Sequence, residues 1–107
     1  MAIVTPWARV LVAGDYLSAV EIPTLNDSGD IGSYLATLER LRPLMGQVDH
    51  VVPGHGPVLS ATDALGLLDE DVSYIRSLSE RPQETDLPEG RRSKQQRVLH
   101  AANLAAL

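Results

Sequence analysis

The chain has 107 residues, of which 44% are hydrophobic and 21% are charged, a composition typical of globular domains and too apolar for a disordered segment. This length allows one hydrophobic core and excludes large catalytic folds such as a complete (β/α)₈ barrel. Fourteen acidic against nine basic side chains give a formal charge of −5, so we do not expect nucleic acid as a partner. Phe is absent, and the core must be built from aliphatic side chains.

The beginning of the chain predicts a β-hairpin. Two short runs rich in β-branched residues, 2–4 and 9–13, are separated by a spacer that contains proline. Residues 10–13 are apolar without alternation, which predicts a strand buried on both faces. Residues 16–29 hold several turn-forming residues and predict an irregular segment.

The middle of the chain predicts a helix followed by a strand. Apolar residues recur at helical spacing from Ile31 to Met45, and Pro43 should end this helix near Leu41. Residues 48–52 predict a short strand that leads into the loop 53–57, which is rich in proline and glycine.

Two further helices are predicted. Ser60 with Asp63 forms a capping-box pattern, and apolar spacing continues to Leu78, with the acidic run 69–71 on a solvated face. Residues 79–90 are interpreted as a surface connection and residues 91–107 as a C-terminal helix. That helix should carry a basic surface cluster of Arg91, Arg92, Lys94 and Arg97.

Taken together, these patterns predict a single α/β (α+β) domain over residues 1–107, with the element order β-β-α-β-α-α. Residues 1–78 supply the sheet and two helices. The first residues form no signal peptide, and no apolar run reaches the length of a membrane span. We therefore expect a cytoplasmic protein that does not contact a membrane.

Two segments could carry chemistry. Gly14-Asp15 follows the apolar strand, and Pro53-Gly54-His55-Gly56 follows the next one. Strand ends are rigid yet open to solvent, and glycines beside a ligand leave room for an ion or a substrate. Asp and His are good ligands for zinc, iron or manganese. Taken without further context, Asp15 could equally cap a turn and His55 could be a surface histidine.

The combination of these motifs, 40 residues apart, resembles the C-terminal half of the metallo-β-lactamase superfamily. The stretches 12–18 and 51–57 look most like that family, and the resemblance extends over about 3–104. It implies an αββα sandwich with two metal ions, where Asp15 bridges the metals and His55 ligates one of them. Gly14, Gly54, Gly56 and His100 would flank the site. His50 is more simply a packing or surface residue, and His100 a hydrogen-bonded structural one.

The family's HxHxDH motif does not occur in this sequence. The chain therefore looks like half of the sandwich, with Asp15 and His55 as an incomplete site. A catalytic zinc needs three protein ligands and water, so we expect weak or absent binding of zinc, manganese or iron by this chain alone. No catalytic residue is assigned, because the aspartate that acts on water belongs to the missing motif.

These expectations lead to two hypotheses of function. The first is the C-terminal portion of a metal-dependent hydrolase of small ester, thioester or lactone-type substrates, similar to glyoxalase-like and lactonase-like members and inactive as an isolated chain. The second is a non-catalytic, self-associating interaction module derived from that fold. Because a half-sandwich leaves one sheet face uncovered, the expected partner is a second copy or a complementary N-terminal half. An unrelated small α/β protein is a third interpretation.

Overall fold

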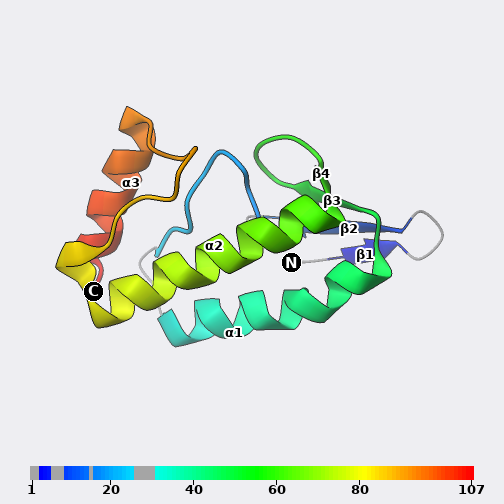
Figure 1. Cartoon of the computed structure of the whole chain (residues 1–107), viewed down its shortest axis with the longest axis horizontal. Helices are drawn as coiled ribbons and strands as arrows, with labels where there is room; N and C mark the ends of the chain where they lie inside the picture. Colours follow the sequence, from blue (N-terminus) through cyan, green and yellow to red (C-terminus); the bar gives the residue numbers. More distant parts are fainter. Residues whose placement is uncertain (1–2, 6–8, 15, 26–30) are drawn as a thin grey trace.

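A computed structural model describes residues 9–14, 16–25 and 31–107, together with the backbone of residues 3–5. Its fold is α+β (Figure 1). The elements in chain order are β1 (Ile3–Thr5), β2 (Val10–Gly14), α1 (Ile31–Leu41), β3 (His50–Pro53), β4 (Leu59–Ser60), α2 (Ala61–Glu80) and α3 (Lys94–Ala105). Short 3₁₀ turns follow α1 at Arg42–Gln47 and α2 at Pro82–Glu84.

The four strands form one mixed sheet in the order β1-β2-β3-β4. β1 and β2 pair antiparallel, which confirms the predicted hairpin, and β2 pairs parallel to β3 across the connection through α1. The two-residue strand β4, which the sequence did not predict, adds an antiparallel edge beside β3. The parallel pair matters most for function, because it places the ends of β2 and β3 at the same edge of the sheet.

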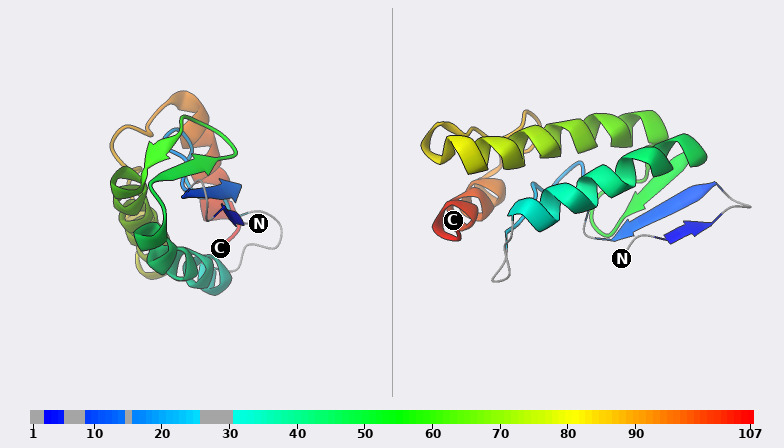
Figure 2. Two further views of the ribbon diagram at one scale, coloured as in Figure 1. Left: turned by 90° about the vertical axis from the view of Figure 1, so that its right-hand side faces the viewer. Right: turned by 90° about the horizontal axis from the view of Figure 1, so that it is seen from below.

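In the part of the chain that the structure describes, helices cover one face of the sheet. Helices α1 and α2 lie side by side over it, as the two views in Figure 2 show. Leu11 and Ala13 of β2 are fully buried beneath them, whereas Val12 between them is 38% exposed. The prediction that residues 10–13 are buried on both faces is therefore wrong for this chain. A uniformly apolar strand does not reveal how many layers cover it, and here the alternation of a pleated strand separates a buried face from an open one.

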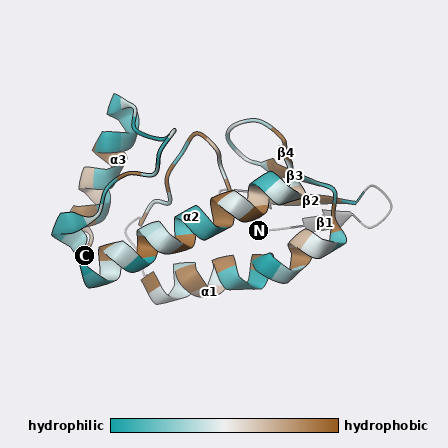
Figure 3. Cartoon of the chain, viewed as in Figure 1, coloured by the Kyte–Doolittle hydropathy of each residue, from teal (hydrophilic) through white to brown (hydrophobic). Residues whose placement is uncertain are grey.

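Helix α1 ends, and helix α2 begins, where local sequence rules place them. Helix α1 ends at Leu41, before Pro43, as predicted. Ser60 caps α2, and its Oγ accepts the backbone N–H of Asp63 at 3.1 Å, which confirms the predicted cap. Apolar residues recur along both helices, whereas α3 is mainly hydrophilic at its beginning (Figure 3).

A second apolar cluster lies at the end of the molecule remote from the sheet. There Ile75 and Leu78 of α2 cluster with Ile22, Leu25 and Leu87. Helix α3 closes this end, and it begins at Lys94 with Ser93 as its cap rather than at Arg91. Two arginines placed in the predicted helix therefore precede it, and Lys94 is the cation that remains at its N-terminus, where a positive charge opposes the helix dipole.

Candidate functional site

The ends of β2 and β3 meet at one edge of the sheet. In the parallel ladder Gly14 lies opposite Pro53, and the backbone N–H of Gly54 donates to the carbonyl oxygen of Gly14. Gly14 has a φ of 63°, a left-handed conformation that favours glycine at this turn. The predicted ligand Asp15 follows Gly14 in the sequence and lies outside the described residues. The two glycine motifs are thus joined at one edge of the sheet.

The loop that carries His55 packs against the segment that leaves β2. Gly56 has a φ of 93°, and a Cβ atom at this position would lie 3.2 Å from Val20 Cγ2 and 3.3 Å from Ser18 Oγ. Glycine is therefore required here both for its backbone conformation and for the close approach of the two segments. Leu17, which is buried, also has a positive φ of 63°. Strained backbone of this kind persists where packing holds it, and it is typical of functional sites.

Side-chain hydrogen bonds order the segment 16–25 after Leu17, the residue with the positive φ. Ser18 Oγ accepts the backbone N–H groups of Val20 and Glu21 at 3.1 and 3.0 Å, which forms a local turn. The turn directs the Glu21 side chain towards the loop, where its Oε1 lies 3.5 Å from Nδ1 of His55. His55 is 60% and Glu21 39% exposed, so the pair lies at the surface beside the strand ends.

The remaining histidines lie elsewhere. His50 is exposed at the beginning of β3, opposite Val10, and so at the other end of the strand from His55. His100 belongs to α3, which Figure 1 places at the end of the molecule remote from the strands. Its Nδ1 lies 2.6 Å from the hydroxyl of Tyr74, which also accepts a hydrogen bond from Asn103 at 3.0 Å. This arrangement gives His100 a hydrogen-bonded role in joining α3 to α2.

A buried arginine is the feature that the sequence interpretation missed most clearly. Arg91, predicted in a basic surface cluster, is 2% exposed. Its Nη1 donates to Asp71 Oδ1 at 2.7 Å and to the carbonyl oxygens of Glu21 at 3.0 Å and Ser18 at 3.3 Å. Its Nη2 reaches the half-exposed Glu70 at 3.3 Å. The other members of the predicted cluster, Arg92, Lys94 and Arg97, are exposed.

Asp71 is the counter-charge of Arg91, and the predicted solvated face over 69–71 is wrong at this residue. Asp71 is 2% exposed, while Asp69 and Glu70 are exposed as expected. Burial raises the pKa of Asp71 to about 6, because desolvation of the carboxylate outweighs the attraction of Arg91. The pair links α2 to the segment that carries Glu21.

Helix α3 holds the far part of the same segment through two buried amides. Gln96 Oε1 accepts the backbone N–H of Ile22 at 2.7 Å, and Asn103 Oδ1 accepts that of Leu25 at 2.7 Å. Asn103 also donates to the carbonyl oxygen of Pro23 at 2.8 Å. The sequence held a signal for this role: Gln96, His100 and Asn103 recur at i, i+4 and i+7, which places polar groups on one helix face. Of these three residues, the prediction of a hydrogen-bonded structural role covers only His100.

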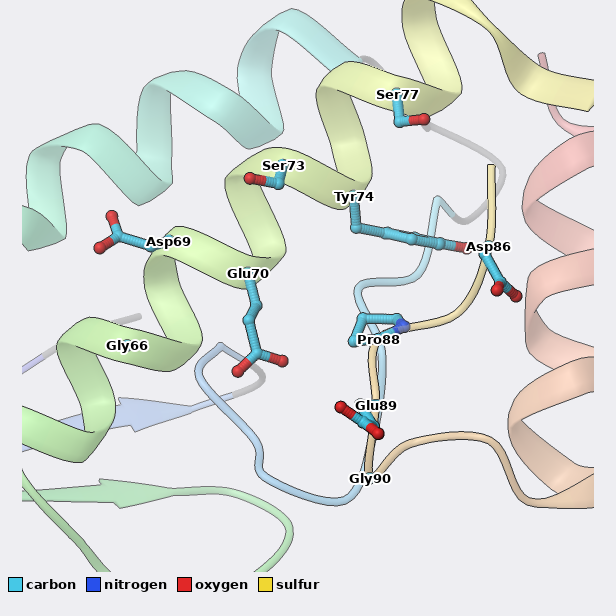
Figure 4. Close-up of a pocket in the computed structure, with 10 residues that line it drawn as sticks. All are labelled: Gly66, Asp69, Glu70, Ser73, Tyr74, Ser77, Asp86, Pro88, Glu89 and Gly90. Atoms are coloured by element: carbon cyan, nitrogen blue, oxygen red, sulfur yellow. The ribbon is translucent and has the colours of Figure 1, made fainter. Parts of the chain in front are cut away.

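A hollow of about 890 Å³ lies between α2 and the segment 86–90, away from the strand ends (Figure 4). Carboxylates from both sides border it, together with Tyr74 and two serines of α2. Most of this charge is compensated by ion pairs, which join Asp69 to Arg42, Glu70 to Arg91 and Asp86 to Arg92. The hollow is therefore an acidic surface feature with its charges largely paired.

Within the described ranges, no three His, Cys, Asp or Glu side chains are grouped so that they could hold a metal ion. Nor is any described helix both long and apolar enough to cross a membrane. Comparison with protein-family models found no match, and comparison with curated proteins found no related sequence either.

Proposed function

We propose that this chain is the C-terminal portion of a metal-dependent hydrolase with the metallo-β-lactamase αββα fold. Its substrates are small esters, thioesters or lactones, and the isolated chain is inactive. The observation that carries this proposal is the hydrogen bond between Gly14 and Gly54. It joins the strand-end Gly-Asp motif to the Pro-Gly-His-Gly loop, the two motifs that a metal site of this fold draws on.

The open face of the sheet supports the same proposal. In the αββα sandwich a second sheet packs on this face, and Val12 and the half-buried Val52, which lie opposite each other on β2 and β3, would then be covered. Apolar side chains at the centre of a sheet are more stable when they are buried. The chain is therefore completed by an N-terminal half that carries the HxHxDH motif.

His55 and Asp15 are residue types that bind transition-metal ions, but two ligands are too few to complete a metal site. His55 offers a ring nitrogen, and Asp15, by its resemblance to the bridging ligand, a carboxylate. A bound zinc or manganese ion would lower the pKa of its water and supply the nucleophile. Because a catalytic site needs at least three protein ligands, this chain binds such an ion weakly and turns over little substrate.

The test is zinc titration of the isotope-labelled full chain, followed by NMR of the histidine side chains. We expect weak, saturable changes in the chemical shifts of the His55 ring. They should be absent in His55→Ala and persist in His50→Ala, the matched control at the other end of β3. Thioester hydrolysis should stay near background with zinc or manganese present. Equal responses of His55 and His50 would contradict a specific site, and strong activity abolished by a chelator would contradict the inactive half.

The open face also favours the second hypothesis, a self-associating module in which a copy of this chain takes the place of the N-terminal half. Sedimentation equilibrium decides between a monomer and a dimer at micromolar concentration. If copies pair through the sheet, Val12→Glu should yield monomers, whereas Val98→Glu, on α3 and 62% exposed, should not. A wild-type monomer contradicts the self-associating module.

A further inference from the structure

We infer that Glu21 is a positioning residue for His55: its carboxylate accepts the Nδ1–H of the imidazole, fixes the ring, and leaves Nε2 free to bind a metal ion. The inference rests on the proposed function for the role of Nε2. It names a residue for which the sequence motifs offered no indication.

Hydrogen bonds hold the backbone of Glu21 and of the next residue, Ile22. The N–H of Glu21 donates to Ser18 Oγ at 3.0 Å, and its carbonyl oxygen accepts from Arg91 Nη1 at 3.0 Å. The next N–H, of Ile22, is bound by Gln96 of α3 at 2.7 Å. A surface loop with no such contacts would sample many conformations, whereas this one is bound to α3 through Gln96 and, through the Arg91–Asp71 pair, to α2.

The backbone of the His55 loop is held against the end of β2 and the segment that follows it. Gly54 is bonded to Gly14 on one side of His55, and Gly56 touches Val20 and Ser18 on the other. Both partners of the His55–Glu21 contact are therefore anchored through their backbones. The distance of 3.5 Å between Nδ1 and Oε1 consequently reflects the fold as well as the attraction of the two groups.

The chemistry of imidazole connects the contact with Glu21 to metal binding by His55. A neutral histidine carries its proton on one ring nitrogen and can ligate a metal only through the other. A carboxylate beside one nitrogen selects the tautomer with the proton on that nitrogen and makes the opposite nitrogen a better ligand. Glu21 lies beside Nδ1, so it selects Nε2 as the ligating atom. The buried pair of Arg91 and Asp71 then acts on the site from a distance, because it fixes the segment that presents Glu21.

The primary test needs no metal. In ¹⁵N-labelled full chain at pH 8, long-range ¹H–¹⁵N correlations of His55 report its tautomer, and we expect the Nδ1–H form to predominate. In Glu21→Ala the Nδ1–H form should be replaced by the mixture of both tautomers that a solvated histidine shows. In Glu21→Gln the amide oxygen still accepts a hydrogen bond, so the Nδ1–H form should largely remain. The matched control is Glu80→Ala, which removes an exposed carboxylate at the far end of α2 and should change nothing at His55.

A second measurement separates this inference from the proposed function. Zinc is titrated into the same four proteins, and we expect Glu21→Ala to weaken the response of His55 about 10-fold or more, with partial recovery in Glu21→Gln. A wild-type His55 in the Nε2–H form, or a tautomer unaffected by Glu21→Ala in a folded variant, overturns the positioning role. If His55 is in the Nδ1–H form but does not respond to zinc, the proposed metal site is overturned while the contact between His55 and Glu21 is upheld.

Discussion

Replacing Arg91 with leucine tests whether the buried ion pair holds the segment that carries Glu21. The Arg91 side chain is 1% exposed, and its Nη1 lies 2.7 Å from Asp71 Oδ1 and 3.0 Å from the carbonyl oxygen of Glu21. In Arg91→Leu the carboxylate stays buried without its counter-charge. Removing one partner of a buried ion pair costs about 3–5 kcal/mol, so we expect the free energy of unfolding at pH 7 to fall by that amount. With a urea slope of about 1.5 kcal/mol per molar, the midpoint should fall by about 2 M or more.

Urea unfolding followed by far-ultraviolet circular dichroism measures the effect. The double variant Arg91→Leu/Asp71→Leu should recover at least half of the loss, because it leaves no unpaired charge in the core. Arg92→Leu is the matched control: its side chain is 51% exposed and paired with the exposed Asp86, so it should change stability by less than about 1 kcal/mol. Equal, small losses in Arg91→Leu and Arg92→Leu would refute the reasoning.

Three further predictions follow from the same contacts. Because burial raises the pKa of Asp71 from 3.8 to about 6, the folded state holds this proton more tightly, and the stability that this group contributes should fall by about 2 kcal/mol as the pH rises from 4 to 6. Asp71→Asn should remove that fall in urea curves at pH 4.5 and 7, and an identical pH profile would contradict the assignment. Gly56→Ala should destabilise by about 1–3 kcal/mol through its φ of 93°, whereas Gly66→Ala, in α2 with open space around it, should stabilise by about 0.5–1 kcal/mol in thermal unfolding. Ser60→Ala should cost about 1 kcal/mol by removing the acceptor of the Asp63 N–H, and Ser60→Asp should restore it; equal melting temperatures for all three proteins would count against the cap.

The candidate site shows where prediction from the sequence reached its limit. The glycine motifs and His55 were found from the sequence because they follow strands that local patterns predict, and parallel neighbours end at the same edge of a sheet. Glu21 was not found, since its contact with His55 depends on a turn set by Ser18 and on Arg91, 70 residues further along the chain. A carboxylate in an irregular segment carries no periodic pattern that would single it out.

The same division runs through the fold. The hairpin, the end of α1 before Pro43 and the cap of α2 at Ser60 were determined by the sequence alone, because each depends on residues within a few positions of one another. Tertiary structure decided that β2 is covered on one face and that Arg91 and Asp71 are buried, against the expectation drawn from their charges. The physical reason is that burial of a charge depends on whether a distant partner compensates its desolvation, and that partner is chosen by the packing of the whole chain.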